Sequence, residues 1–181
     1  MHRTWMGFVG AALLIMPGAA QAGTQGWKTA SDVGAYGLIS LSIGLPAVRG
    51  DKQGAFQAGG SFAATSVVTE VLKQTFPRWR PDGSDRKSFP SGHTSRSFAA
   101  AASIYNRQGP ALGIPALAVA GFVGLARVEG KKHYWSDVAV GAGLGTAIGF
   151  LITRDRPEAQ TTAFMPWADT SGGGFTFAAQ F

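Results

Sequence analysis

Most of this chain consists of segments of helical length that are rich in alanine, glycine and other apolar residues and are separated by short breaks. Proline, glycine or charged residues form those breaks, and such residues end helices. The candidate helices run from Ser31-Asp32 to about Val48, from Gln53 to about Phe76, from Ser91 to about Asn106, from the Gly109-Pro110 break to about Arg127, and from about His133 to Ile152. The sequence therefore predicts an all-α fold, a compact bundle of about five helices.

The N-terminal segment, residues 1–22, has the pattern of a secretory signal peptide. A short basic start precedes an apolar run from Trp5 to Met16, and Ala20-Gln21-Ala22 ends the segment. Cleavage after Ala22 would place the rest of the chain in the periplasm. The alternative is that the segment is retained as a first transmembrane helix, although its apolar run is short for a span.

Two locations remain open for the helical domain, residues 23–160. Its apolar stretches are each shorter than the ~20 residues that a membrane-spanning helix requires, which favours a periplasmic domain. These stretches are Val33–Val48, Ala111–Ala126 and Val138–Ile152. The stripe Gly141-x3-Gly145-x3-Gly149 would allow close helix packing in a membrane, and it favours an integral inner-membrane protein with a site that faces the periplasm.

The C-terminal tail, residues 161–181, differs from the rest of the chain. Phenylalanine alternates with smaller or polar residues from Phe175 to Phe181, and Gly172-Gly173-Gly174 precedes this stretch. A period of two is typical of a β-strand, and a glycine-rich segment is typical of a turn. The tail is expected to form a short β-hairpin, with a glycine-rich tail of no fixed structure as the alternative.

Composition excludes several classes of protein and points to an anionic partner. Charged residues make up only 14% of the chain, too few for a nucleic-acid-binding arm or a coiled coil. The absence of cysteine excludes thiolate zinc sites and cysteine nucleophiles. The net charge is +6, and the basic residues gather around His93 and His133. Cations hold a phosphate dianion while imidazoles transfer protons or attack phosphorus, so this pattern indicates a phosphate-handling site.

Three short blocks carry the candidate chemistry. They are Lys73-x6-Arg80-Pro81, then Pro90-Ser91-Gly92-His93, then Arg127-x5-His133-x3-Asp137. The second block opens a helix, whose free backbone N–H groups suit an anion. In the third block, Asp137 follows His133 by four residues and would hold its Nδ1–H from the same helix face. Taken singly, each block has an ordinary interpretation as a helix cap, a surface pair or a solvated cation.

In their order and internal spacing, the three blocks resemble the signature of the type 2 phosphatidic acid phosphatase superfamily. That superfamily also includes bacterial non-specific acid phosphatases and vanadium haloperoxidases. The resemblance covers the chain from Lys73 to Asp137. It departs at Ala126, where the family usually has serine, so one hydroxyl contact to phosphate is expected to be missing.

The resemblance implies a role for each matched residue. His133 would attack phosphorus and form a phosphohistidine, and Asp137 would orient it. His93 would protonate the leaving group and then activate water. The phosphoryl oxygens would be bound by Lys73, Arg80, Ser91, Gly92 and Arg127. No cofactor and no metal are expected, because the blocks contain no obvious cluster of metal ligands.

The sequence therefore predicts a phosphatase that hydrolyses a phosphomonoester or diphosphate, either a membrane lipid phosphate or a soluble ester, outside the cytoplasm. Two other functions remain open. One is a vanadium-dependent haloperoxidase, which would hold vanadate at His133, and the other is a non-catalytic anion- or lipid-binding protein. Phe76, Trp79 and Trp135 flank the blocks and would contact either an acyl chain at the membrane surface or the protein's own interior.

Overall fold

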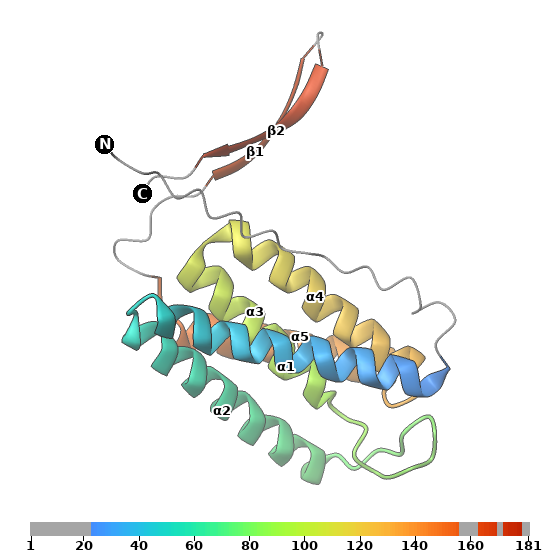
Figure 1. Ribbon diagram of the computed structural model, residues 1–181. Helices are drawn as coiled ribbons and strands as arrows, with labels where there is room; N and C mark the ends of the chain where they lie inside the picture. Colours follow the sequence, from blue (N-terminus) through green and yellow to red (C-terminus); the bar gives the residue numbers. More distant parts are fainter. Residues whose placement is uncertain (1–22, 156–162, 170–171, 179–181) are drawn as a thin grey trace.

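The computed structural model describes residues 23–155, 163–169 and 172–178, and these contain five α-helices. The helices are α1 (Thr24–Val48), α2 (Lys52–Thr75), α3 (Gly92–Gln108), α4 (Pro110–Glu129) and α5 (Trp135–Ile152). They lie side by side in one bundle (Figure 1). Helix α3 packs against all four of the others and forms the centre of the bundle. The predicted all-α bundle of five helices is confirmed.

Two helices begin at positions that differ from the prediction, and local hydrogen bonds explain both. Helix α1 begins at Thr24, seven residues before Ser31. The Ser31 hydroxyl donates to the Lys28 carbonyl oxygen at 2.7 Å, so it lies within the helix and does not cap it. Helix α5 begins at Trp135, because the Asp137 carboxylate accepts a hydrogen bond from the Tyr134 backbone N–H at 2.9 Å and caps the first turn. His133 therefore precedes the helix.

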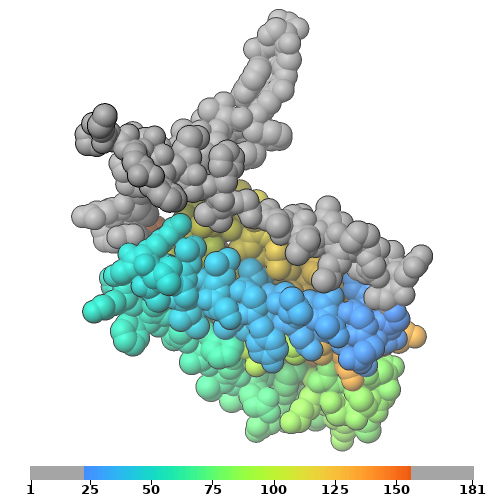
Figure 2. Space-filling view, in the orientation of Figure 1, coloured from blue at the N-terminus to red at the C-terminus, as the bar shows by residue number. Residues whose placement is uncertain are grey.

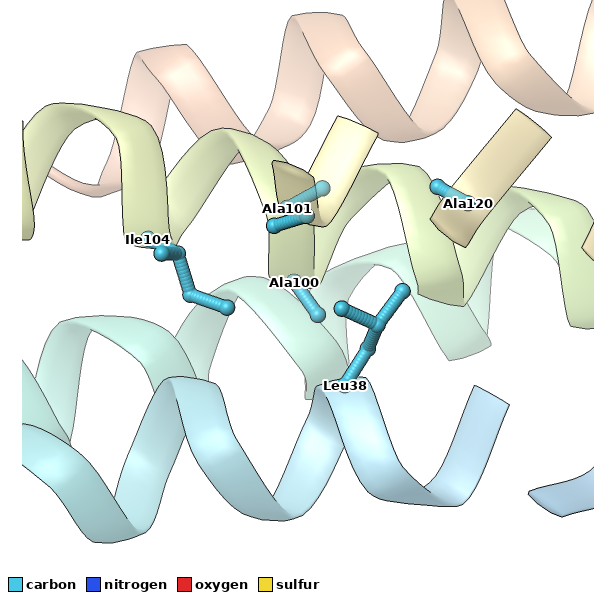
Figure 3. Close-up of a cluster of buried hydrophobic side chains, with 6 residues drawn as sticks. Leu38, Ala100, Ala101, Ile104 and Ala120 are labelled. Atoms are coloured by element: carbon cyan, nitrogen blue, oxygen red, sulfur yellow. The ribbon is translucent and has the colours of Figure 1, made fainter. Parts of the chain in front are cut away.

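The core around α3 is built from small side chains. Ala99, Ala101 and Ala102 on α3 are fully buried. A neighbouring apolar cluster joins α3 to α1 and α4 (Figure 3); it comprises Leu38, Ala100, Ala101, Ile104, Ala116 and Ala120. Because alanine adds little bulk, the neighbouring helices approach the α3 backbone closely.

The glycine stripe of α5 faces α3. A Cβ atom at Gly141 would lie 2.7 Å from the Ser91 carbonyl oxygen, and one at Gly149 would lie 2.8 Å from the Ala99 carbonyl oxygen. A Cβ atom at Gly145 would overlap the Ser95 carbonyl oxygen. The stripe is thus the surface along which α5 contacts the backbone of α3, and the contact begins at Ser91, inside the second sequence block.

Replacing Gly145 with alanine is expected to destabilise the bundle by about 1–3 kcal/mol or more, because the added methyl group forces α5 away from α3. Gly143 on the same helix is the matched control, since nothing lies within 4 Å of a Cβ atom there. Gly143→Ala is expected to leave stability unchanged or raise it, because alanine favours helix. Thermal unfolding of the purified variants measures both effects, and equal unfolding temperatures would contradict the packing argument.

Three of the helices, α1, α4 and α5, are long and apolar enough to cross a membrane. They contain 25, 20 and 18 residues. Helix α1 is longer than its apolar stretch because it continues through the more polar residues that precede Val33. The helices are thus longer than the apolar stretches seen in the sequence, and the second of the two expected locations, the membrane, gains support.

Two strands follow the bundle in the chain. Strands β1 (Ala163–Asp169) and β2 (Gly172–Ala178) pair antiparallel, with Ala163 opposite Ala178. Residues 170 and 171, which would form the turn, lie outside the described residues, so the hairpin stays a prediction. The signal peptide at residues 1–22 and the domain boundary near residue 160 also lie outside the described residues.

Candidate active site

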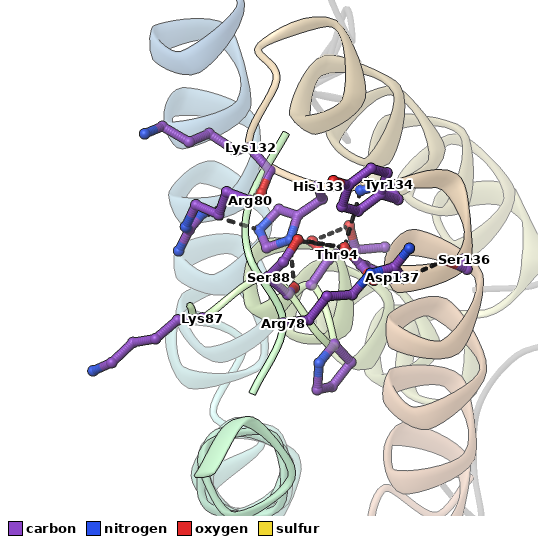
Figure 4. A network of polar contacts seen from close by, with 12 residues as sticks. Arg78, Arg80, Lys87, Ser88, Thr94, Lys132, His133, Tyr134, Ser136 and Asp137 are labelled. Carbon is purple, nitrogen blue, oxygen red and sulfur yellow. Dashed lines mark hydrogen bonds and ion pairs between the residues drawn. The ribbon is translucent and has the colours of Figure 1, made fainter. Parts of the chain in front are cut away.

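The three sequence blocks meet at one end of the bundle. Lys73 lies in the last turn of α2 and Arg127 in the last turn of α4. His93 lies in the first turn of α3, and His133 lies just before α5. The long loop between α2 and α3 lies at this end, and Figure 4 shows part of the resulting polar network. Residues far apart in the sequence are thus brought together as the blocks predicted.

The imidazole of His133 is buried and fixed in orientation. Its Nδ1 lies 2.7 Å from the Ser88 carbonyl oxygen, which can only accept, so Nδ1 carries the proton and Nε2 has a lone pair. Nε2 faces a guanidinium nitrogen of Arg80 at 3.5 Å. Burial lowers the pKa of His133 to about 4, although Asp137 acts to raise it. The ring is therefore neutral at pH 7, as a nucleophile or base must be.

Asp137 acts on His133 less directly than predicted. Its Oδ2 lies 3.8 Å from Nδ1 of His133, too far for a hydrogen bond. Oδ2 instead accepts from the Ser88 hydroxyl at 2.6 Å and from the Tyr134 N–H. Oδ1 accepts from Arg78 at 2.8 Å. The predicted hydrogen bond is not made because His133 lies in the preceding loop and not on the helix face of Asp137.

Ser88 and Arg78 are site residues that the sequence analysis missed. Ser88 is fully buried, and it contacts His133 through its carbonyl oxygen and Asp137 through its hydroxyl. The Arg78 guanidinium lies 4.1 Å from the ring centre of Tyr134 and also donates to Asp137. Both residues belong to the long loop between α2 and α3, which is rich in basic residues. Their position in that loop was the only signal available in the sequence.

Lys73 and Arg80 have the positions predicted for phosphate-binding cations, and both also hold the loop. The Lys73 ammonium donates to the carbonyl oxygens of Lys87 and Pro90 at 2.7 and 2.6 Å. Burial, together with the nearby Arg80 charge, lowers the pKa of Lys73 to about 8. Arg80 pairs with Asp85 at 2.7 Å. The cations are therefore held in place before any substrate binds.

Arg127 offers an unused donor. Its side chain is only 8% exposed, and its NH1 donates to the Ser31 hydroxyl at 3.1 Å. Its Nε is buried and has no hydrogen-bond partner within the described part of the chain. A buried donor without a partner is costly. A phosphate oxygen at this position would satisfy it.

The start of α3 presents backbone donors beside these cations. A Cβ atom at Gly92 would lie 3.1 Å from a guanidinium nitrogen of Arg96 and 3.7 Å from Cε of Lys73. The hydroxyl of Ser91, a predicted phosphate-binding residue, pairs with the Thr94 hydroxyl at 2.9 Å. The helix N-terminus and the cations around it form a site that favours an anion.

His93 lies at the same helix start and contacts a carboxylate from α1. Its Nε2 lies 2.8 Å from Oδ1 of Asp32, a residue that the sequence analysis considered only as the start of a helix. Burial and the charge of Arg127 lower the pKa of His93 to about 4, and Asp32 opposes this shift. The two imidazoles therefore lie in one basic environment, each held by a different acceptor.

Comparison with known proteins identifies the family. The PAP2 superfamily profile matches residues 54–161, more than half of the chain. Lipid A 1-phosphatase of Porphyromonas gingivalis is 39% identical over 82 residues, which is 44% of this chain and 18% of that protein. Decaprenylphosphoryl-5-phosphoribose phosphatase of Mycobacterium tuberculosis is 30% identical over 123 residues, covering 61% and 64% of the two chains. The chain thus spans less than two thirds of the length of these relatives.

Solved structures show the same fold. The crystal structure of Aquifex aeolicus LpxE aligns with a TM-score of 0.60 and 24% identity over 71% of this chain and 83% of that one. A transmembrane PAP2-type phosphatidylglycerolphosphate phosphatase from Bacillus subtilis aligns with a TM-score of 0.57 and 23% identity over 71% and 74%. Together with the profile match and the three blocks assembled at one end of the bundle, these similarities show that the chain belongs to the PAP2 superfamily.

Proposed function

We propose that this chain is a phosphatase that hydrolyses the phosphomonoester or diphosphate group of a membrane lipid. The observation that carries the proposal is the buried, neutral His133, whose Nε2 lone pair faces Arg80 beside the helix start of α3. A nucleophilic nitrogen next to fixed cations suits attack on a phosphoryl group. The relatives are named as phosphatases of lipid A, of decaprenylphosphoryl-5-phosphoribose and of lipid phosphates, and this shared class supports a lipid substrate.

In the first step, Nε2 of His133 attacks phosphorus and forms a P–N bond while the P–O bond to the leaving group breaks. His93 gives its proton to the leaving oxygen in its imidazolium form, which the negative charge of the bound phosphoryl group stabilises. As the imidazole of His133 becomes positively charged, the Nδ1–H bond to the Ser88 carbonyl oxygen and the nearby Asp137 carboxylate stabilise it. The phosphohistidine is the intermediate that this geometry supports.

In the second step, His93 takes a proton from water, and the resulting hydroxide attacks phosphorus as the P–N bond breaks. Inorganic phosphate leaves and His133 returns to its neutral form. Through both steps negative charge spreads over the equatorial phosphoryl oxygens, and fixed positive charges stabilise it most. The proposed donors are the side chains of Lys73, Arg80 and Arg127 and the backbone N–H group of Gly92, since the Ser91 N–H already donates to the Asp137 carbonyl oxygen at 3.0 Å.

Release of phosphate by the purified full chain tests this function. A lipid phosphate in detergent and a soluble ester with the same reacting group form the matched pair, and the lipid is expected to react faster. Turnover should persist in a strong chelator, since the proposed mechanism requires no metal. No phosphate release from either ester, or a requirement for a divalent cation, would contradict the proposal. Halide oxidation by the vanadate-loaded protein would instead support a haloperoxidase.

The proposal includes a location in the membrane, with the active site facing the periplasm. Helices α1, α4 and α5 are the candidate spans, and large apolar side chains point outward from each. Among these side chains are Val33, Leu41, Ile114, Phe122, Val140 and Leu151. Figure 2 shows α1 along one face of the molecule.

Membrane fractionation tests the location. The chain is expected to stay in the membrane pellet after washes with high salt and with carbonate, because three apolar helices hold it there. Sequencing the N-terminus checks the predicted cleavage, which would leave Gly23 as the first residue. Release of the chain in soluble form by osmotic shock would contradict the membrane location and support the alternative, a periplasmic domain.

A further inference from the structure

We propose that Asp32 is a positioning residue that orients His93 for proton transfer; this inference rests on the proposed phosphatase function. Asp32 belongs to α1, which precedes the residues that match the superfamily profile. None of the three sequence blocks contains it. Its position is nevertheless fixed by contacts with two of them.

The contacts of Asp32 connect the second block to the third. Its Oδ1 lies 2.8 Å from Nε2 of His93 and 3.6 Å from NH1 of Arg127. The same NH1 donates to the hydroxyl of the preceding residue, Ser31, at 3.1 Å. Two consecutive residues of α1 thus hold both the proposed acid and a proposed phosphate-binding cation. Arg127 in turn pairs with the same carboxylate oxygen of Asp32 that contacts His93.

This arrangement assigns a different task to each nitrogen of His93. Nε2–H donates to the Asp32 carboxylate, because a carboxylate oxygen can only accept. Nδ1 has no hydrogen-bond partner among the described residues and is the nitrogen left for the substrate. In the first step Nδ1–H gives its proton to the leaving oxygen, and in the second step Nδ1 takes one from water. Asp32 keeps Nε2 protonated and stabilises the imidazolium throughout.

The surroundings of His93 show why such a partner matters. Arg127 on α4, Arg96 on α3 and His133 before α5 all act to lower the pKa of His93, as burial does, and Lys73 on α2 lies beside the adjacent Gly92. Asp32 on α1 is the carboxylate that acts in the opposite direction. Removing its charge would make the imidazolium harder to form, and a general acid is active only while it is protonated.

The test compares Asp32→Asn with the wild type on an alkyl and an aryl phosphate, measured in the first turnover. Asp32→Asn is expected to slow the alkyl ester by about 10²-fold and the aryl ester by less than about tenfold, because a phenoxide leaving group needs little protonation. The fall in rate at high pH should begin at lower pH in the variant. Asp32→Glu keeps the carboxylate and should recover part of both effects.

Glu129→Gln is the matched control, since it removes an exposed carboxylate from the same end of the bundle without contacting His93. In a His93→Ala background, Asp32→Asn should add at most about a threefold further loss on the alkyl ester, because coupled residues are not additive. An active wild type together with an unchanged Asp32→Asn variant, or with equal losses on both esters and an unmoved pH profile, would overturn the inference. An inactive wild type would overturn the proposed function itself.

Discussion

Replacing His133 with alanine is expected to abolish both phosphate release and the covalent phosphoenzyme, with a loss of turnover on the order of 10⁴-fold or more. The reason is geometric. The ring is 2% exposed, its Nδ1–H is held by the Ser88 carbonyl oxygen, and only Nε2 is directed toward the cations. Within the proposed mechanism no other group forms the bond to phosphorus. To measure the intermediate, the protein is allowed to react with labelled substrate and is then quenched. The acid-labile, base-stable label that stays on the protein is the phosphoenzyme.

His133→Asn is the sharper variant for this test. Its side-chain amide keeps an N–H donor for the Ser88 carbonyl oxygen, so the buried acceptor stays satisfied, but it has no nucleophilic nitrogen. It should therefore be more stable than His133→Ala and equally inactive. Stability measured by thermal unfolding separates loss of chemistry from loss of fold. A phosphoenzyme that forms in either variant would show that His133 is not the nucleophile.

The five helices could be predicted because breaks and apolar composition are local properties of the sequence. The start of α1 could not, since its first turns are polar or small and are held by distant parts of the chain. Trp27 packs against Phe122 of α4 with ring centres 6.3 Å apart, and Ser31 contacts Arg127. Tertiary contacts of this kind extend a helix beyond its apolar pattern, and the same extension makes α1 long enough to span a membrane.

The site could be predicted as a set of residues but not as a set of contacts. The three blocks predicted that His93 and His133 belong to one site, and the fold brings both residues to the same end of the bundle. Spacing also suggested that Asp137 binds His133 directly, but capping of α5 turns that carboxylate toward the Tyr134 N–H. Asp32 and Ser88 were missed for a common reason. Each acts through two long-range contacts, and contacts between residues so far apart leave no period or motif in the sequence.

Replacing His93 with alanine is expected to separate the two steps of the reaction. General acid catalysis contributes about 10²- to 10⁴-fold, and it contributes less when the leaving group is already good. The first turnover of an alkyl phosphate should therefore be severely slowed, because its alkoxide needs the proton. The first turnover of nitrophenyl phosphate should be slowed much less. Rapid-mixing measurements of product release on both esters give these rates.

The second step should fail in His93→Ala for both esters, because it depends on activation of water and not on the leaving group. With nitrophenyl phosphate, phosphoenzyme is then formed faster than it is hydrolysed, and a burst of nitrophenol should precede a slow steady rate. His133→Ala should show no burst with either ester, since it forms no intermediate. If His93→Ala instead slowed the burst equally for alkyl and aryl esters, His93 would be a phosphate-binding or structural residue, and the carboxylate of Asp32 would have no acid to position.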